Sequence, residues 1–315
     1  MSMSIRLENG KYAGANDMIS MGMEAMKIMP KKYVLRSRIA LKTAEYIIER
    51  NENLSLLEKC HFIAYESDTS ATNYLRALLN GYGTEEKKKK LQRVFTALSG
   101  NNAGDSYSIY GSDSICSERR ENKPDGNMTL FLRFLDGQFA DVLEKGLNKS
   151  EALGWSGTFM KQGIALYLLC LHEGRWSGRG INAMAEIARN AMGFSAEEYR
   201  RGTSGLNADN ETDLFQEIFF KWKSIVPMEP DIRTSALNKI TNLIEKRTEG
   251  IMSANRRNYY GECAAYIAAL GEVRESLGER GAKQKLMTSY KDAYSRRSAF
   301  REELRRYGWI DSKRR

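Results

Sequence analysis

Proline and histidine are scarce in this sequence, and long apolar runs do not occur. Only 4 of its 315 residues are proline, against a usual share of about 5%. Because proline lacks an amide N–H and collides with the preceding helical turn, its scarcity favours long helices. No stretch reaches the roughly 18 apolar residues of a membrane span, so we expect no membrane contact of that kind. The two histidines, His61 and His172, limit histidine-dependent chemistry.

Cysteine is also sparse, and its placement bears on the cellular compartment. A scattered set without a pairing pattern is typical of a protein kept in a reducing environment. That set consists of Cys60, Cys116, Cys170 and Cys263. The first ten residues include Arg6 where a signal peptide needs an apolar run, so export is not expected. The sequence therefore predicts a soluble, cytoplasmic protein.

The first third of the chain has helical periodicity. Val34, Leu41 and Ile48 recur every seven residues and mark one apolar stripe. Similar stripes predict four helices. These occupy residues 31–50, 54–65, 69–79 and 84–98. Short connections group the helices into two helix–turn–helix pairs, so we assign residues 1–99 to N-terminal helical pairs.

Residues 100–127 have a different composition. They are rich in Gly, Ser, Asn and Asp, and they include Pro124. Loops of this length are usually functional, disordered or domain junctions, so we interpret the segment as a polar loop or linker. A short strand over 107–110 is the alternative within it.

Helical patterns resume at Met128 and continue to the end of the chain. The predicted helices occupy residues 128–142, 150–171, 181–192, 211–225, 231–246, 256–277, 280–290 and 295–307, with a short helix capped by Ser195. No segment alternates convincingly with the period of a strand. The predicted fold class is all-α: an irregular stack of antiparallel helices, similar to a helical repeat or α-solenoid. Residues 128–315 would form a C-terminal helical-repeat domain with a basic tail.

The end of the chain carries a family resemblance. It rests on ANRRNYYGECAAYIAALGEVRESLG at 254–278 and SRRSAFREELRRYGW at 295–309. The shared features are Arg256-Arg257, Tyr259-Tyr260, Leu270-Gly271-Glu272, Arg296-Arg297, Phe300, Leu304 and Gly308-Trp309. These resemble the helical tail of some bacterial SWIM-type zinc-finger proteins. The resemblance implies a tetratricopeptide-like interaction module and no catalytic residue. A SWIM finger needs a Cys-x-Cys, which this sequence lacks, so zinc binding is not implied.

Two short motifs have the residue types of metal ligands. Cys170 and His172 have the spacing of half a metal site, and the adjacent Cys60 and His61 offer the other two ligand types. The alternative is a buried core cysteine and a histidine that stabilises the end of a helix. We favour this alternative and predict neither a metal nor another cofactor.

The glycine-rich segment at 172–180, HEGRWSGRG, offers an anion-binding alternative. Its glycines would end one helix and admit another. The turn before Ile181 would then present backbone amides, with Arg175 and Arg179 beside them. These two arginines are the candidate anion-binding residues, although most helix N-termini bind only water.

Glu262 and Glu272 are candidates for general acid–base catalysis. They lie ten residues apart, close to one face of the predicted helix at 256–277. We favour a structural role for them instead: a buried glutamate paired with an arginine of the next helix. The catalytic residues are therefore unknown, and we lean against an enzyme.

Positive charge is concentrated at the C-terminus. Residues 280–315 carry 12 Lys and Arg against 4 Asp and Glu, a net +8, whereas the whole chain carries +9. Arginine side chains bind phosphate with fixed geometry and stack on bases. The candidate nucleic-acid-binding residues are Arg296, Arg297, Arg301, Arg305, Arg306 and Trp309. The alternative is that Glu302 and Glu303 neutralise part of the stripe and that its arginines form intramolecular bridges.

The leading functional hypothesis is a non-enzymatic helical-repeat module that recruits a protein partner in a bacterial cytoplasm. The alternative is a nucleic-acid-binding protein that uses the basic C-terminal helices. A third hypothesis is a nuclease or transferase.

Overall fold

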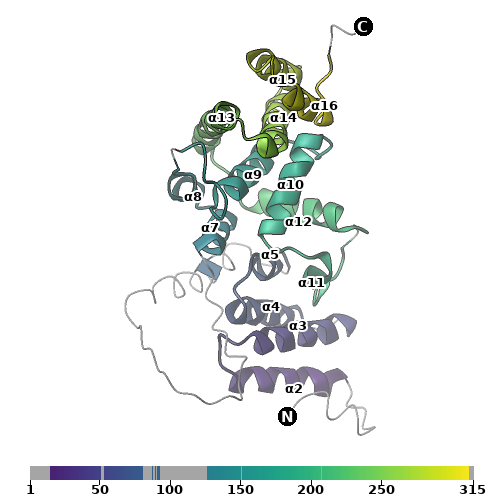
Figure 1. The fold of residues 1–315 in the computed structure, drawn as a ribbon. Helices are drawn as coiled ribbons and strands as arrows, with labels where there is room; N and C mark the ends of the chain where they lie inside the picture. Colours follow the sequence, from purple (N-terminus) through teal and green to yellow (C-terminus); the bar gives the residue numbers. More distant parts are fainter. Residues whose placement is uncertain are drawn as a thin grey trace, which may run out of the picture. The chain divides into compact units, whose positions relative to one another are not determined.

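The computed structural model describes residues 15–50, 53–80, 87, 89, 91–92, 126–149, 151–206 and 208–311 (Figure 1). This part of the chain is all-helical and contains no strand. The predicted all-α class is therefore confirmed. The predicted helix at 84–98 lies largely outside the described residues, as do most of the predicted loop at 100–127 and the alternative strand at 107–110. No described helix is long and apolar enough to cross a membrane.

The chain folds into two compact units, and both are discontinuous in sequence. Unit 1 comprises Met1–Asp136 and Met192–Ile225, and unit 2 comprises Gly137–Ala191 and Val226–Arg315. This partition differs from the linear division into 1–99 and 128–315. A stretch of 34 residues from the expected C-terminal domain, 192–225, belongs to unit 1.

Unit 1 is built from seven described helices. They are α2 (Ala15–Ile28), α3 (Val34–Glu49), α4 (Leu54–Ser67), α5 (Ala71–Leu79), α7 (Gly126–Leu135), α11 (Ala196–Arg200) and α12 (Glu211–Ile225). Side-chain caps start several of them: the Ser70 and Ser195 hydroxyls accept the backbone N–H groups of Asn73 and Glu198. The cap at Ser195 was predicted, whereas the prediction for α5 was a cap one or two residues earlier, at Asp68 or Thr69. Helix α2 was not predicted, and its core contacts come from Met18, Ile19 and Met26.

A buried arginine joins the first three helices of unit 1. Arg36, on α3, donates from Nε to the Met26 carbonyl of α2, at 3.0 Å. Its Nη1 donates to Glu66 at 2.8 Å and to the Ser67 hydroxyl at 3.0 Å, both on α4. The side chain thus connects α2, α3 and α4, and the buried charge has a carboxylate partner.

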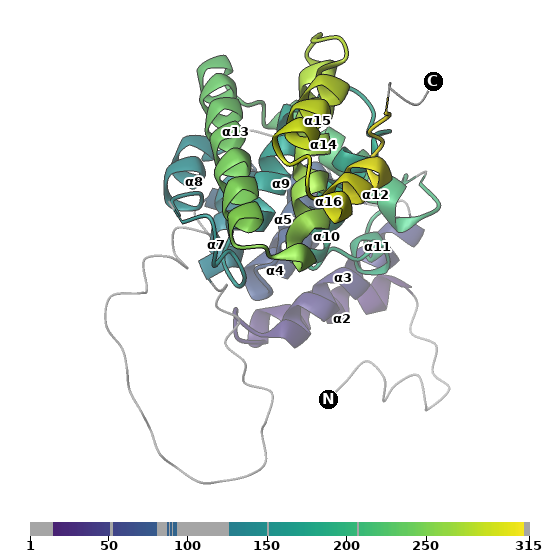
Figure 2. The ribbon, with the colours of Figure 1, turned by 45° about the horizontal axis from the view of Figure 1, so that its top comes forward.

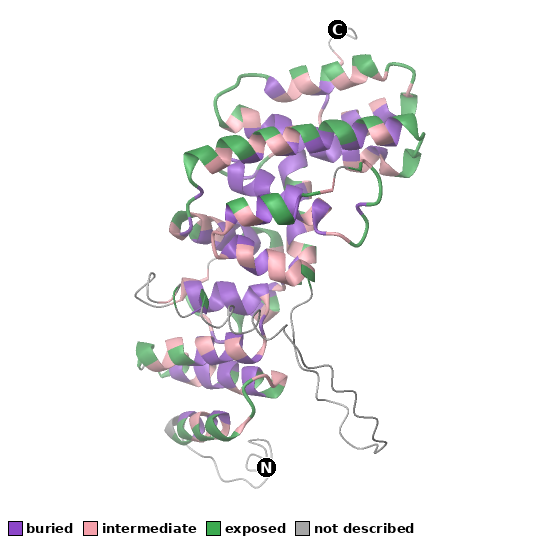
Figure 3. Ribbon diagram, turned by 90° about the vertical axis from the view of Figure 1, so that its left-hand side faces the viewer, coloured by how far each residue is buried: buried purple, intermediate pink, exposed green. Residues whose placement is uncertain are grey.

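Unit 2 contains seven described α-helices and one short 3₁₀ helix. They are α8 (Phe139–Lys145), α9 (Met160–Leu171), α10 (Arg179–Ala191), α13 (Pro230–Ser253), η1 (Arg257–Tyr259), α14 (Tyr260–Ser276), α15 (Ala282–Ala293) and α16 (Ser298–Arg306). Helix α14 packs against α9, α10, α13, α15 and α16, and it is buried almost all round (Figure 2). Leu168 of α9 and Ile267 of α14 are fully buried, as their apolar stripes predict. In Figure 3 many helices carry buried residues on one side and exposed residues on the other.

Two predicted helices have different bounds. The helix expected over 150–171 begins only at Met160, because Gly154 and Gly157 adopt positive φ values of 79° and 72°. The pattern over 128–142 is divided between α7 and α8 at Gly137, whose φ is 83°. A left-handed glycine between two apolar stripes ends a helix without interrupting the hydrophobic pattern.

Candidate functional sites

The predicted arginine stripe on α16 forms contacts within unit 2. Arg297 donates from Nη1 to Asn255 Oδ1 at 2.6 Å and from Nη2 to a carbonyl in the last turn of α13 at 3.0 Å. Arg305 pairs with Glu302 at 2.9 Å, and Arg306 pairs with Glu303 at 3.0 Å. These contacts are the intramolecular bridges that the sequence analysis gave as the alternative to nucleic-acid binding.

Trp309 is packed into unit 2 and is only 5% exposed. Its indole N–H donates to the Thr288 hydroxyl at 3.1 Å. The cationic groups of Lys291 and Arg305 lie 5.9 and 5.6 Å from its ring centroid. The ring therefore holds the end of the chain against α15, and its contacts are internal cation–π contacts rather than an open face for a base.

Two other arginines of the predicted interface are not paired in this way. Arg296 is exposed, and none of the ion pairs among the described residues involves it. Arg301 is partly buried, and its Nε has no hydrogen-bond partner among the described residues. Free positive charge therefore lies at the N-terminal end of α16, whereas the C-terminal end is compensated by Glu302 and Glu303.

The predicted anion-binding turn before α10 already holds a carboxylate of the chain itself. Glu272 of α14 accepts the backbone N–H groups of Gly180 at 3.2 Å and of Ile181 at 2.6 Å. Lys283 of α15 adds an ion pair at 2.6 Å. Glu272 is 6% exposed, so the helix N-terminus, its anion and the countercharge are buried together. An external anion at these amides would have to displace Glu272.

The two arginines expected beside that turn lie on the surface. Arg175 and Arg179 are both exposed. Arg179 donates from Nη1 to the backbone carbonyl of Arg306 at 2.7 Å. The fold thus joins one residue of the predicted anion site to one of the predicted nucleic-acid interface, across 127 positions of sequence.

Glu262 forms two ion pairs in unit 2, with Arg247 of α13 and with Lys161 of α9. It accepts from Nε and Nη2 of Arg247, at 3.0 and 2.8 Å. Arg247 is 2% exposed, and its guanidinium lies between the rings of Trp155 and Tyr259, 4.8 and 5.0 Å from their centroids. Its Nη1 also donates to the Ala152 carbonyl at 2.7 Å. The expected pairing with arginine is present, but the partner comes from the preceding helix, α13.

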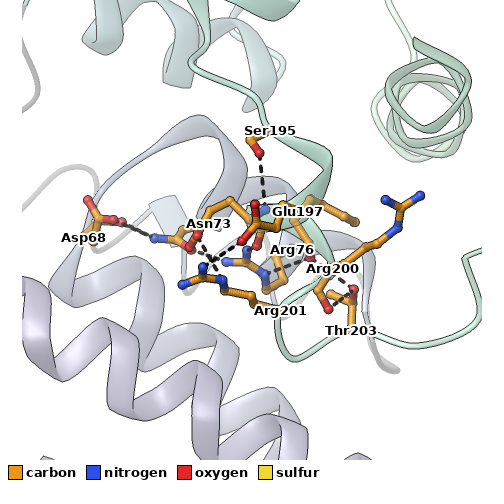
Figure 4. Close-up of polar contacts among 10 residues, drawn as sticks. Asp68, Asn73, Arg76, Ser195, Glu197, Arg200, Arg201 and Thr203 are labelled. Atoms are coloured by element: carbon orange, nitrogen blue, oxygen red, sulfur yellow. Dashed lines mark hydrogen bonds and ion pairs between the residues drawn. The ribbon is translucent and has the colours of Figure 1, made fainter. Parts of the chain in front are cut away.

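Unit 1 contains a polar centre between α5 and α11 (Figure 4). Arg76 is fully buried and donates to the Tyr199 carbonyl at 3.4 Å, to the Glu198 carbonyl and to Asn73 Oδ1. Burial lowers the pKa of Arg76 to about 10. Because the last carbonyls of a helix carry partial negative charge, the guanidinium stabilises the end of α11. Asn73 in turn donates to the Asp68 carbonyl at 2.8 Å.

His61 holds the chain just beyond α11. Its Nε2 lies 2.6 Å from the Gly202 carbonyl, so Nε2 carries the proton and donates. Its Nδ1 is buried without a hydrogen-bond partner among the described residues. Burial is the main cause that lowers the pKa of His61 to about 4, and the charges of Arg76 and Lys87 add to it. The histidine is therefore neutral at pH 7.

The possible metal ligands are divided between the two units: Cys60 and His61 belong to unit 1, and Cys170 and His172 belong to unit 2. Within the described ranges, no group of three or more His, Cys, Asp or Glu side chains is placed to hold a metal ion. Cys60 and Cys170 are buried, and neither is in a disulfide. Burial raises the pKa of the Cys60 thiol to about 12, so it stays protonated at neutral pH.

One cavity of about 360 Å³ opens in unit 1. It is lined by Ser55, Glu58, Lys59, Phe62, Ala77, Lys87 and Leu91. Lys87 lies in its wall, where it pairs with Glu58 at 3.1 Å and donates to the Asn80 carbonyl at 2.6 Å. Its size is that of a small-molecule pocket, and its lining combines apolar side chains with an internally paired cation.

The buried arginines were missed by sequence reasoning. Arg36, Arg76 and Arg247 are between 0 and 8% exposed, although charged residues are almost never fully buried unless paired. A sequence signal exists for Arg76, which stands within a run of apolar residues, Tyr74-Leu75-Arg76-Ala77-Leu78.

No protein-family model matches the chain, and no curated protein or solved structure matches it either.

Proposed function

We propose that this protein is a non-enzymatic helical-repeat module that recruits a protein partner in a bacterial cytoplasm. The observation that carries the proposal is the packing of helices on their neighbours in sequence. In unit 1, α2, α3, α4 and α5 pack in succession, and in unit 2 α13, α14, α15 and α16 do so. Helical-repeat proteins are built from such local packing, and they bind partners on the faces that it leaves exposed.

The resemblance of residues 254–309 to the tail of SWIM-type proteins supports the same function. This segment supplies η1, α14, α15 and α16, of which α14 is the central helix of unit 2. A module of this kind needs a rigid core and a free outer surface. The buried ion pairs of Arg247 and of Glu272 supply part of that rigidity.

Nucleic-acid binding is the second candidate, and the net charge of +9 favours it. If Arg297, Arg301 and Arg305 contact phosphates, changing all three to Glu removes binding to a generic duplex or single strand. Three to five phosphate contacts would make the wild-type affinity fall roughly 40- to 500-fold between ~50 and ~200 mM salt. The internal contacts of Arg297 and Arg305 favour the protein-binding function.

The test is to identify what the full chain retains from a cell lysate before and after nuclease digestion. A protein that stays bound after digestion and crosslinks to exposed positions of the helices is the expected result. The triple change should then lower thermal stability, and the wild type should bind little nucleic acid even at ~50 mM salt. Tight, steeply salt-dependent binding of nucleic acid by folded wild type, with no retained protein, would overturn the proposal.

A further inference from the structure

Two Arg-Arg pairs that are 40 positions apart in sequence meet at one corner of unit 2. Arg256 and Arg257 follow directly after Asn255, at the junction of α13 and η1. Arg297 donates to Asn255 Oδ1 at 2.6 Å, and Arg296 precedes it at the start of α16. The contact brings both pairs to the same place. We call the four residues the arginine quartet.

The quartet carries uncompensated positive charge. Arg256, Arg257 and Arg296 are exposed, and no ion pair among the described residues involves any of the three. The hydrogen-bond acceptors of Arg297 are an amide oxygen and a backbone carbonyl, both neutral. The last two turns of α13 carry one exposed carboxylate, Glu249. Glu249 is therefore the one exposed carboxylate within the end of α13, η1 and the first turn of α16, the segments next to the four arginines.

Backbone and side-chain contacts hold the corner in place. Asn255 adopts a left-handed conformation with φ of 50°, and the Tyr260 hydroxyl donates to its Oδ1 at 3.4 Å. The Arg256 amide donates to the Ile251 carbonyl at 3.0 Å, which closes the end of α13. The Arg297 amide donates to the Tyr294 carbonyl at 2.9 Å. A surface with a fixed backbone loses less conformational entropy when a ligand binds.

The charge pattern on α16 indicates the kind of partner. Beyond the quartet, Arg301 adds one more cation, but Arg305 and Arg306 are paired with Glu302 and Glu303, so the uncompensated positive charge ends within the first half of α16. A duplex carries one negative charge per ~1.7 Å of its axis, and its backbone would therefore extend onto these carboxylates. A short acidic peptide segment needs only the corner itself, where arginines can bind carboxylates in bidentate geometry.

We propose that the arginine quartet binds an acidic segment of the partner protein. This inference rests on the proposed protein-binding function and names the chemistry of its partner. Each exposed arginine supplies a planar pair of N–H donors for one carboxylate, and Arg297 holds the two halves of the surface together.

The test measures binding of a fluorescently labelled peptide of about twelve alternating Glu and Asp residues to the full chain at low salt. The variant is Arg256→Glu with Arg257→Glu. The matched control is Arg280→Glu with Lys285→Glu, which changes the net charge equally at two exposed positions that have no ion pair among the described residues. We expect the variant to lose at least about 10-fold in affinity and the control to lose less than about 2-fold, because like charges repel at the contact itself.

Two outcomes would overturn the assignment. Equal losses in both variants would show that the peptide responds only to net charge. Tighter binding of a single strand or duplex with the same number of charges, lost in the same variant, would assign the quartet to nucleic acid. Thermal unfolding of each variant verifies its fold, and Arg257→Gln with Arg296→Gln provides a milder second variant.

The two proposals fail in distinguishable ways. If wild type and variant retain the same protein partner equally, the quartet does not bind it, whereas the protein-binding function stands. If neither retains a protein partner, the proposed function itself is wrong.

Discussion

Replacing Gly180 by alanine tests the closest approach between two helices of unit 2. A Cβ at this position would lie 2.6 Å from the Ala268 carbonyl carbon and 2.8 Å from the Ala269 Cα, both backbone atoms of α14. Ordinary contact begins at 3.4 Å, and the Ala269 backbone nitrogen would be closer still, so α10 and α14 would have to separate by about 1.1 Å. Gly180 does not have a positive φ, so the change adds no backbone strain of that kind.

The energetic cost has two parts. Overpacking of this kind costs about 1–3 kcal/mol. Separation of the helices also stretches the hydrogen bonds from the Gly180 and Ile181 amides to Glu272, and a hydrogen bond to a charged group contributes about 1.5–3 kcal/mol. These hydrogen bonds would be stretched and not broken, so only part of their energy is lost. We therefore expect the free energy of unfolding to fall by about 2–4 kcal/mol in urea or thermal denaturation.

Gly261→Ala is the matched control. It lies on α14, and its added Cβ would meet only the Glu303 carboxylate, with Oε2 at 3.1 Å, the far end of a flexible side chain. Because that carboxylate can move, we expect a change of less than about 1 kcal/mol. If Gly180→Ala costs no more than Gly261→Ala, the close packing of α10 on α14 does not stabilise unit 2, and our account of the Glu272 contact is wrong.

Three further predictions concern buried groups. Leu168→Ala or Ile267→Ala should each lower the free energy of unfolding by ~2–5 kcal/mol, and a loss below ~1 kcal/mol in urea would show that the site is not core. The pKa of His61 is lowered from 6.5 to about 4, so the unfolded chain takes up the proton first. The contribution of His61 to the free energy of unfolding is fully present above pH 6.5 and decreases by about 3 kcal/mol as the pH falls to 4. Urea unfolding measured across this pH range should show this decrease in the wild type, and His61→Gln should remove it. Arg247→Met should lower the free energy of unfolding by about 1.5–3 kcal/mol in thermal unfolding, because it removes the charged hydrogen bonds to Glu262 while Glu262 keeps its ion pair with Lys161.

Local sequence was sufficient for most of the helices. The bounds of α12, Glu211–Ile225, agree with the prediction, and Ser195 caps α11 as expected. Both depend on interactions within a few residues: an apolar stripe at helical spacing and a hydroxyl that reaches the third amide of the next turn. The burial of Leu168 and Ile267 follows from the same local pattern.

Long-range contacts determined everything that distinguishes a candidate site from an ordinary helix surface. Glu272 satisfies the N-terminus of α10 from 91 positions away, and Arg297 reaches Asn255 across 42. The periodicity of either helix contains no information about such partners. The local sequence around a charged residue can be the same whether that residue lies on the surface or in a buried ion pair. The same holds for residues 192–225, which belong to unit 1, where α11 and α12 pack on α5 and the carbonyls around α11 accept hydrogen bonds from Arg76 and His61. The sequence alone therefore determined a helical protein with an excess of C-terminal positive charge. Only the tertiary structure decided which of those charges are paired internally and which have no ion pair among the described residues, since pairing depends on distances between segments that the fold brings together.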